Sequence, residues 1–159
     1  MTPPSNLVIT NLSTYLAIAQ DSLSESQTIG AAQRRPRPGG GEVITLDPDQ
    51  RSFKLSLIAI AFAGMYLDAL LYLYGCKKLG EAAYAKIDFD GYEKKLECFG
   101  IVDQALLDDA KEFRQARKEL VHEKAHEQTE LRVAQDEAQK GVDLIHRVRL
   151  ALPPLSSAK

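Results

Sequence analysis

Residues 53–75 read FKLSLIAIAFAGMYLDALLYLYG, an almost unbroken apolar stretch that is consistent with two different folds. Its 23 residues are enough for a helix that crosses a bilayer. Asp68 interrupts it near the C-terminal third, and a carboxylate inside a bilayer costs about 2.5 to 3.5 kcal/mol. The alternative is the central helix of a bundle, buried on nearly all sides, with Asp68 facing a polar partner or an active cleft. We favour this second interpretation, because the rest of the chain supplies amphipathic helices able to cover it.

The composition favours a single all-α domain. Of 159 residues, 45% are hydrophobic, 7% are aromatic and none is tryptophan, a balance typical of a helical bundle. The net charge of -2 excludes a global positive field, so any contact with nucleic acid has to be local. Cys76 and Cys98 have neither the density of a disulfide scaffold nor the spacing of a zinc ribbon. The N-terminus, MTPPSNLVITNL, has no signal-peptide features and predicts a cytoplasmic protein.

Together with the segments on either side of residues 53–75, we expect a bundle of about five helices. Helical spacing of apolar residues predicts a first helix from Ser5 to about Glu25, within residues 1–25. A loop rich in proline, glycine and arginine follows over residues 26–50, then the bundle itself over 51–152 and a short tail over 153–159. After the long apolar helix, the pattern predicts short helices near 80–86 and 92–99, a periodic helix from Val102 and a last helix over about 129–150.

Three arginines, Arg34, Arg35 and Arg37, stand in the predicted loop. They are able to contact an RNA backbone, but a charged, proline-rich loop is more often only solvated. The sequence alone leaves both interpretations open.

Residues 113–128, FRQARKELVHEKAHEQ, carry the candidate chemistry. Cleavage of RNA needs a base with a pKa near neutrality to take the ribose 2′ proton, and a fixed cation to stabilise charge on the phosphate. His122 and Arg117 suit these two roles. Five residues correspond to about 140° of rotation on a helix, so the two side chains diverge on one straight helix. Either the helix breaks near Val121 or two chains combine.

The same residues resemble the signature of the HEPN superfamily, in which an arginine is followed after four to six residues by a histidine at the end of the penultimate helix. RKELVH, residues 117–122, has this form. The apolar helix GMYLDALLYLYG and the closing helix TELRVAQDEAQKGVDLIHRV lie where HEPN domains have theirs. The resemblance covers about residues 53–152, and it implies a helical bundle that forms a homodimer with both motifs in a cleft at the two-fold interface.

The resemblance also implies an activity: metal-independent cleavage of RNA, such as tRNA or mRNA, by attack of the 2′ oxygen, without a cofactor. Arg117 and His122 would be the catalytic pair, with Lys118 and Arg114 as RNA-binding cations. Such proteins often act as toxins or in phage defence, under control of an antitoxin or an activating protein. Lys118 departs from the asparagine, aspartate or histidine frequent in the family. Lys124 replaces the tyrosine of the subgroup paired with nucleotidyltransferase antitoxins, so that partnership is not expected.

Two alternatives remain at this stage. His122, Glu123 and His126 match the zincin pattern H-E-x-x-H, which puts two imidazoles on one helical face. A zincin also needs a third ligand and usually a sheet edge that holds the peptide, and neither is evident, so we expect no metal site. The second alternative is a catalytically inactive HEPN-like module that dimerises or binds a partner through its basic loop.

Overall fold

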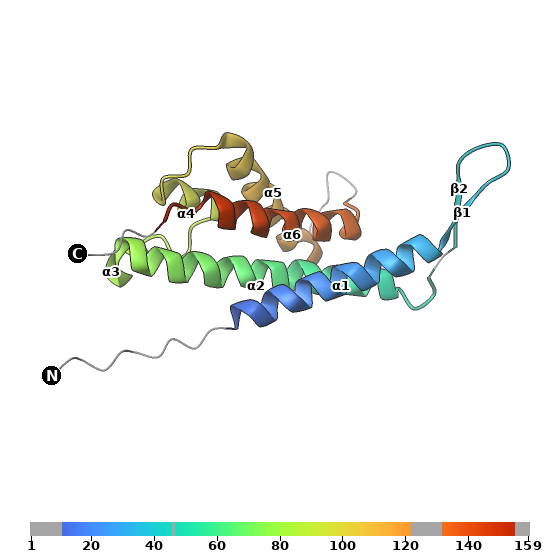
Figure 1. Cartoon of the computed structure of the whole chain (residues 1–159), viewed down its shortest axis with the longest axis horizontal. Coiled ribbons are helices and arrows are strands. Elements are labelled where there is room, and N and C mark those ends of the chain that lie inside the picture. Colours follow the sequence, from blue (N-terminus) through green and yellow to red (C-terminus); the bar gives the residue numbers. More distant parts are fainter. Residues whose placement is uncertain (1–10, 46, 122–131, 155–159) are drawn as a thin grey trace.

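The computed structural model describes residues 11–45, 47–121 and 132–154. These form a helical bundle with one small antiparallel hairpin (Figure 1), which confirms the all-α prediction. The elements, in chain order, are α1 (Leu12–Ala32), β1 (Arg34–Pro36), β2 (Glu42–Ile44), α2 (Arg51–Leu79), α3 (Glu81–Tyr84), α4 (Tyr92–Cys98), α5 (Gln104–Val121) and α6 (Ala134–Ala151).

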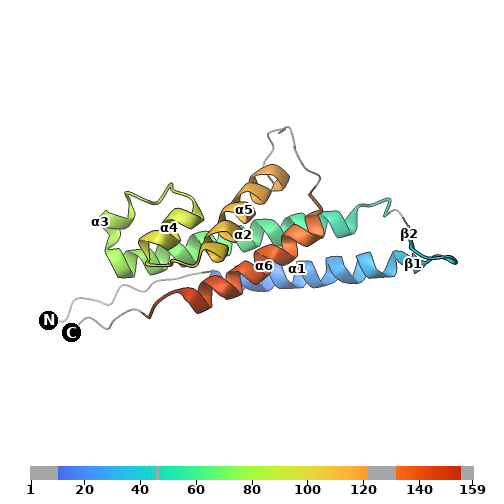
Figure 2. The same cartoon turned by 90° about the horizontal axis from the view of Figure 1, so that it is seen from above.

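Helix α2, the predicted central helix, is the axis of the molecule. It contacts each of the five other helices in the described part of the chain, and α1 and α6 pack along it (Figures 1 and 2). Ile60, Leu67 and Leu71 of α2 are fully or almost fully buried, in one cluster with Leu23 of α1 and Ile145 of α6. Burial of such side chains stabilises a fold by about 1.5 to 3 kcal/mol each, so the bundle is assembled on α2.

One face of α2 is nevertheless open, so the expectation that this helix is buried on nearly all sides is wrong. Ile58, Met65, Tyr72 and Leu79 are 40%, 37%, 48% and 36% exposed. They recur every seven residues, close to two helical turns, and therefore form a single line along the helix. We call these four residues the α2 stripe. The same helix is long and apolar enough to cross a membrane, with a mean hydropathy of 1.8 and 44% of its most apolar window buried.

The first helix extends beyond its predicted end near Glu25, to Ala32. Ser26 is fully buried, and its hydroxyl lies 2.8 Å from the Ser56 hydroxyl and donates a hydrogen bond to the Ser52 carbonyl at 2.9 Å. These contacts with α2 satisfy the hydrogen-bonding capacity of the Ser26 hydroxyl. The sequence around Ser26 predicts that a loop begins there. Tertiary packing thus overrides the local signal.

Part of the predicted loop is regular, because β1 and β2 pair antiparallel and form a hairpin that projects from one end of the bundle (Figures 1 and 2). Pro38 and Gly39 are the central residues of a turn closed by a 3.1 Å hydrogen bond from the Gly40 N–H to the Arg37 carbonyl. Gly39 has a φ of 97°, which a type II turn requires at this position and which glycine adopts without strain. Pro38 and Gly39, which exclude a helix at this point of the chain, therefore form the tight turn of the hairpin.

Candidate functional site

Arg117 lies one turn before the last described residue of α5. Leu106, Ala110 and Phe113 form the buried face of this helix, and Arg117 follows Phe113 by four residues on the same side. Arg117 therefore lies on the buried side of α5. Its guanidinium group consequently points towards α2 and not into open solvent.

Two polar groups hold the guanidinium. The Arg117 Nη1 atom donates to Asp68 Oδ2 of α2 at 2.8 Å and to the Tyr92 hydroxyl of α4 at 2.6 Å. The Arg117 side chain is 26% exposed and that of Asp68 is 48% exposed, so the ion pair lies at the edge of the core. Burial opposes the charged form, but the interactions with Tyr92 and Asp68 raise the pKa of Arg117 overall. We call Arg117, Asp68 and Tyr92 the arginine clamp.

A glycine of α2 makes room for the clamp. A Cβ atom at Gly64 would lie 2.4 Å from Nε and 2.6 Å from Cδ of Arg117. The arginine side chain therefore lies directly against the α2 backbone, one helical turn before Asp68. Any larger residue at position 64 would have to displace it.

Tyr92 joins the clamp from the first turn of α4. Tyr92 is 4% exposed, and its ring is stacked on that of Phe113 with the ring centroids 6.5 Å apart. Its hydroxyl donates a hydrogen bond to the Gly64 carbonyl at 3.4 Å. Burial, and secondarily the charge of Asp68, raise the pKa of Tyr92, so the hydroxyl stays protonated. Neither Tyr92 nor Gly64 belongs to a motif that predicts a functional site. The only local signal was Gly64 standing four residues before Asp68.

The two predicted RNA-binding cations differ in their surroundings. Arg114 donates from Nε and Nη2 to the Glu93 carboxylate at 3.3 and 2.8 Å, which ties α5 to α4. Partial burial opposes ionisation of Glu93, but the hydrogen bond from Arg114 lowers its pKa overall. Lys118 is exposed and forms no ion pair within the described part of the chain. Of the two, Lys118 is the cation available to a ligand.

His122 lies outside the described residues, as do Glu123 and His126 of the zincin alternative. Val121 is the last described residue of α5, so His122 follows it directly in the chain. Across residues 11–45, 47–121 and 132–154, no group of three or more His, Cys, Asp or Glu side chains is placed to hold a metal. The structure therefore brings Arg117 to a defined position but does not describe its predicted partner.

An ion-pair network flanks the segment that contains His122. Arg132, which precedes α6, donates from Nε to the Glu119 carboxylate of α5 at 2.6 Å and also lies near Glu112 and Glu137. Glu137 is 4% exposed, and Lys140 compensates its charge at 2.8 Å. Arg132 and Glu119 thus hold together the two ends of the chain segment that carries residues 122–131.

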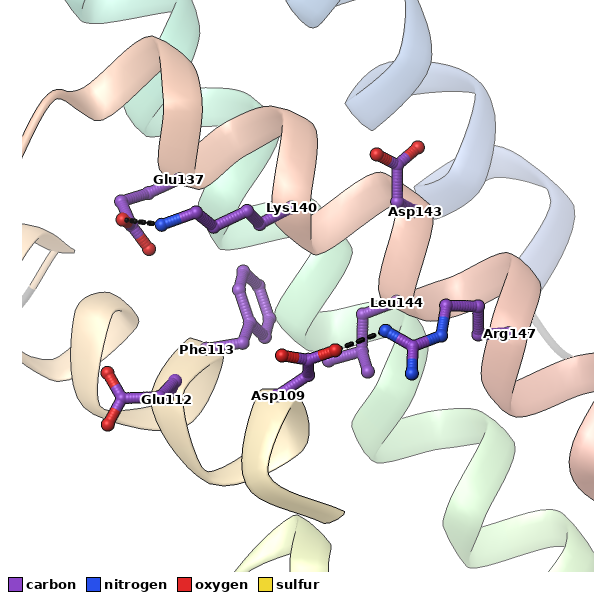
Figure 3. A pocket seen from close by; sticks show the side chains of 8 residues that line it. All are labelled: Asp109, Glu112, Phe113, Glu137, Lys140, Asp143, Leu144 and Arg147. Carbon is purple, nitrogen blue, oxygen red and sulfur yellow. Dashed lines mark hydrogen bonds and ion pairs between the residues drawn. The ribbon is translucent and has the colours of Figure 1, made fainter. Parts of the chain in front are cut away.

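A cavity of about 280 Å³ lies between α5 and α6, and Arg117 is not among its lining residues (Figure 3). Its two cations are already paired: Arg147 donates to Asp109, and Lys140 lies 2.8 Å from Glu137. Phe113 borders the cavity and lies so close to Gly141 that a Cβ atom there would be 2.4 Å from its ring. We therefore regard this cavity as part of the packing between α5 and α6.

Comparison of the chain with models of known protein families, with characterised proteins and with solved structures found no match in any of the three.

Proposed function

We propose that the protein is a cytoplasmic, metal-independent endoribonuclease of HEPN type that works as a homodimer. The observation that carries this proposal is the position of Arg117. It is held by Asp68 and Tyr92, lies beside the exposed α2 stripe and stands five residues before His122. An arginine fixed beside an open apolar surface is suited to act on a ligand bound at a subunit interface.

The donors of Arg117 suit a phosphate. Only Nη1 is used within the described part of the chain, which leaves Nε and Nη2 for a second anion. Two N–H groups in a planar fork match two oxygens of a phosphodiester, and bidentate contacts of this kind are strong. Arg117 would stabilise the charge that develops on the phosphate, while His122 would take the 2′ proton or protonate the leaving oxygen.

The α2 stripe suggests where a second copy would bind. Asp68 follows Met65 by three residues and precedes Tyr72 by four, so it lies on the same side of α2 as the stripe. A two-fold related copy packed on this surface would bring two arginine clamps into one cleft. The geometric conflict between Arg117 and His122 on one helix would then disappear, because each could act with a residue of the partner.

The first test is cleavage of total cellular RNA and tRNA in excess EDTA. We expect the wild type to cut, and Arg117→Ala and His122→Ala to lose at least 100-fold in rate while remaining folded. Arg147→Ala is the matched control, because Arg147 also joins two helices through a single carboxylate, Asp109, but lies away from the clamp. If Arg117→Ala and His122→Ala cut like the wild type, the assigned pair is wrong.

A catalytically inactive module is the second candidate, and the ion pair between Arg117 and Asp68 favours it. A carboxylate 2.8 Å from Nη1 already compensates the charge that catalysis needs. Absence of cleavage by pure wild-type protein, with dimerisation retained, would support this candidate or a requirement for an activator. For the active enzyme, we propose a role as a toxin or phage-defence effector, restrained by an antitoxin or released by an activating protein.

A further inference from the structure

The hairpin of β1 and β2 has no core of its own. All six strand residues are exposed, including Val43 at 50% and Ile44 at 65%. A two-stranded hairpin is at best marginally stable in water, and burial does not account for this one. Its conformation comes from backbone pairing that begins at Gln33, the residue directly after α1. The Gln33 carbonyl accepts a hydrogen bond from the Thr45 N–H at 2.8 Å.

The register divides the charges between the two faces of the hairpin. Arg34 pairs with Ile44, Arg35 with Val43 and Pro36 with Glu42. Directly paired residues lie on the same face, and successive residues alternate. One face therefore carries Arg34 and Glu42, whose side chains form an ion pair at 3.2 Å.

The other face carries Arg35. Arg37 shares it, because the hydrogen bond from the Arg37 N–H to the Gly41 carbonyl continues the same register. Val43 is the residue opposite Arg35, so this face bears two arginines and no carboxylate. We call Arg35 and Arg37 the arginine face.

These two arginines differ from most others in the described part of the chain. Six of its nine arginines form ion pairs with carboxylates: Arg34, Arg51, Arg114, Arg117, Arg132 and Arg147. Arg35 and Arg37 form none there, and neither does Arg149 near the C-terminal end of α6. In a protein of net charge -2, the arginine face is thus a local concentration of uncompensated positive charge.

We infer that the arginine face binds the phosphate backbone of the RNA substrate, at a distance from the cleavage site. The inference rests on the proposed function for the identity of the ligand. Arginines two residues apart on a strand are separated by about 7 Å and are both free to form charge-assisted hydrogen bonds with phosphate oxygens. Contacts to phosphate oxygens carry no sequence information, so they would position RNA without selecting its sequence.

The position of the hairpin defines which RNAs can use it. The hairpin ends at Ile44, seven residues before α2 begins at Arg51, whereas Arg117 lies against Gly64, thirteen residues further along that helix. At 1.5 Å per residue this is about 20 Å. A folded RNA can reach both places, whereas a dinucleotide or trinucleotide at Arg117 cannot.

The test measures binding of labelled tRNA at several salt concentrations, in a His122→Ala background that prevents cutting. We expect Arg35→Ala with Arg37→Ala to weaken binding about tenfold at low salt. The slope of log affinity against log salt should become shallower by about 1.4 to 1.8, which corresponds to two phosphate contacts. Arg149→Ala, an unpaired arginine at the opposite end of the molecule, should change neither quantity.

Two further variants separate a role in binding from a role in folding. Arg35→Lys with Arg37→Lys should retain most of the affinity, because the charges remain. The cleavage test uses Arg35→Ala with Arg37→Ala in a protein that keeps His122. This variant should cut tRNA more slowly than the wild type but cut a dinucleotide at the wild-type rate.

The outcomes distinguish this inference from the proposed function. Wild-type affinity and slope in the double alanine variant would overturn the inference, and a protein partner would become the better occupant of the hairpin. Equal loss in the lysine and alanine variants would overturn it as well. Hairpin-dependent binding without any cleavage would support the inference and contradict the proposed nuclease. Absence of tRNA binding by the wild type would contradict both.

Discussion

Gly64 shows how much the candidate site depends on a missing side chain. Glycine inside a helix costs about 0.5 to 1 kcal/mol relative to alanine, so its presence in the middle of α2 needs a reason. The reason in the structure is Arg117, which lies where a Cβ atom would be. Gly64, which no motif marks, therefore determines the position of Arg117, the predicted catalytic residue.

A double-mutant cycle at these two positions tests this contact. We expect Gly64→Ala to destabilise the wild-type protein by about 1 kcal/mol or more, because the new methyl group displaces the guanidinium and breaks the clamp. In an Arg117→Ala background the same change should stabilise by about 0.5 to 1 kcal/mol, since only helix propensity remains. Urea denaturation of the four proteins measures the coupling. The same effect of Gly64→Ala in both backgrounds would show that the contact is absent.

At the scale of the elements, the start of α2 depends on a carboxylate that precedes it. Asp47 Oδ2 accepts the N–H of Ser52, the second residue of α2, at 3.2 Å, and Oδ1 accepts that of Asp49 at 3.1 Å. Desolvation opposes ionisation of Asp47, but these backbone hydrogen bonds lower its pKa overall. Asp47 therefore acts as a cap for the longest helix of the bundle.

The cap predicts a pH dependence of its own. A lowered folded-state pKa means that Asp47 stabilises the fold above its unfolded pKa, near 3.9, and that this contribution is lost as the pH falls through the folded value. We expect Asp47→Ala to be less stable than the wild type at pH 7 and the difference to shrink below about pH 4. Asp49→Ala is the matched control, because the Asp49 carboxylate accepts no hydrogen bond from described residues. A difference that stays constant down to pH 2 would contradict the assignment.

The helices could be predicted from sequence because their apolar spacing is local. Periodicity locates α5 and α6, Gly100 precedes α5 and Pro153 follows α6. No such residue marks the start of α6, which begins at Ala134 and not near residue 129 as predicted. The hairpin was missed because glycines and prolines also mark tight turns, and strands of three residues carry no periodic signal. The contact between Tyr92 and Arg117 spans 25 residues and arises only when α4 packs on α5. The open face of α2 was missed because a helix that is apolar all round does not reveal which side its neighbours leave uncovered.

At the scale of the whole molecule, the α2 stripe predicts self-association. We expect the wild type to have twice the 17.6 kDa mass of the chain in light scattering, and Met65→Glu to be monomeric, because a charge placed between apolar surfaces is costly. Leu150→Glu, which changes an 88% exposed leucine of α6, is the control and should stay dimeric. Circular dichroism should show unchanged helicity in both variants. A monomeric wild type, or a dimeric Met65→Glu, would exclude the stripe as the interface.

Because the arginine clamp borders the α2 stripe, one surface would control both assembly and reactivity. Under the proposed function, dilution below the dissociation constant of the dimer would abolish activity without any inhibitor. The rate would then rise with the square of the amount of protein at low abundance and linearly once dimers predominate. The cell would be spared at basal expression and exposed only after synthesis crosses a threshold, so that gene dosage would add to the restraint that an antitoxin or activating protein provides.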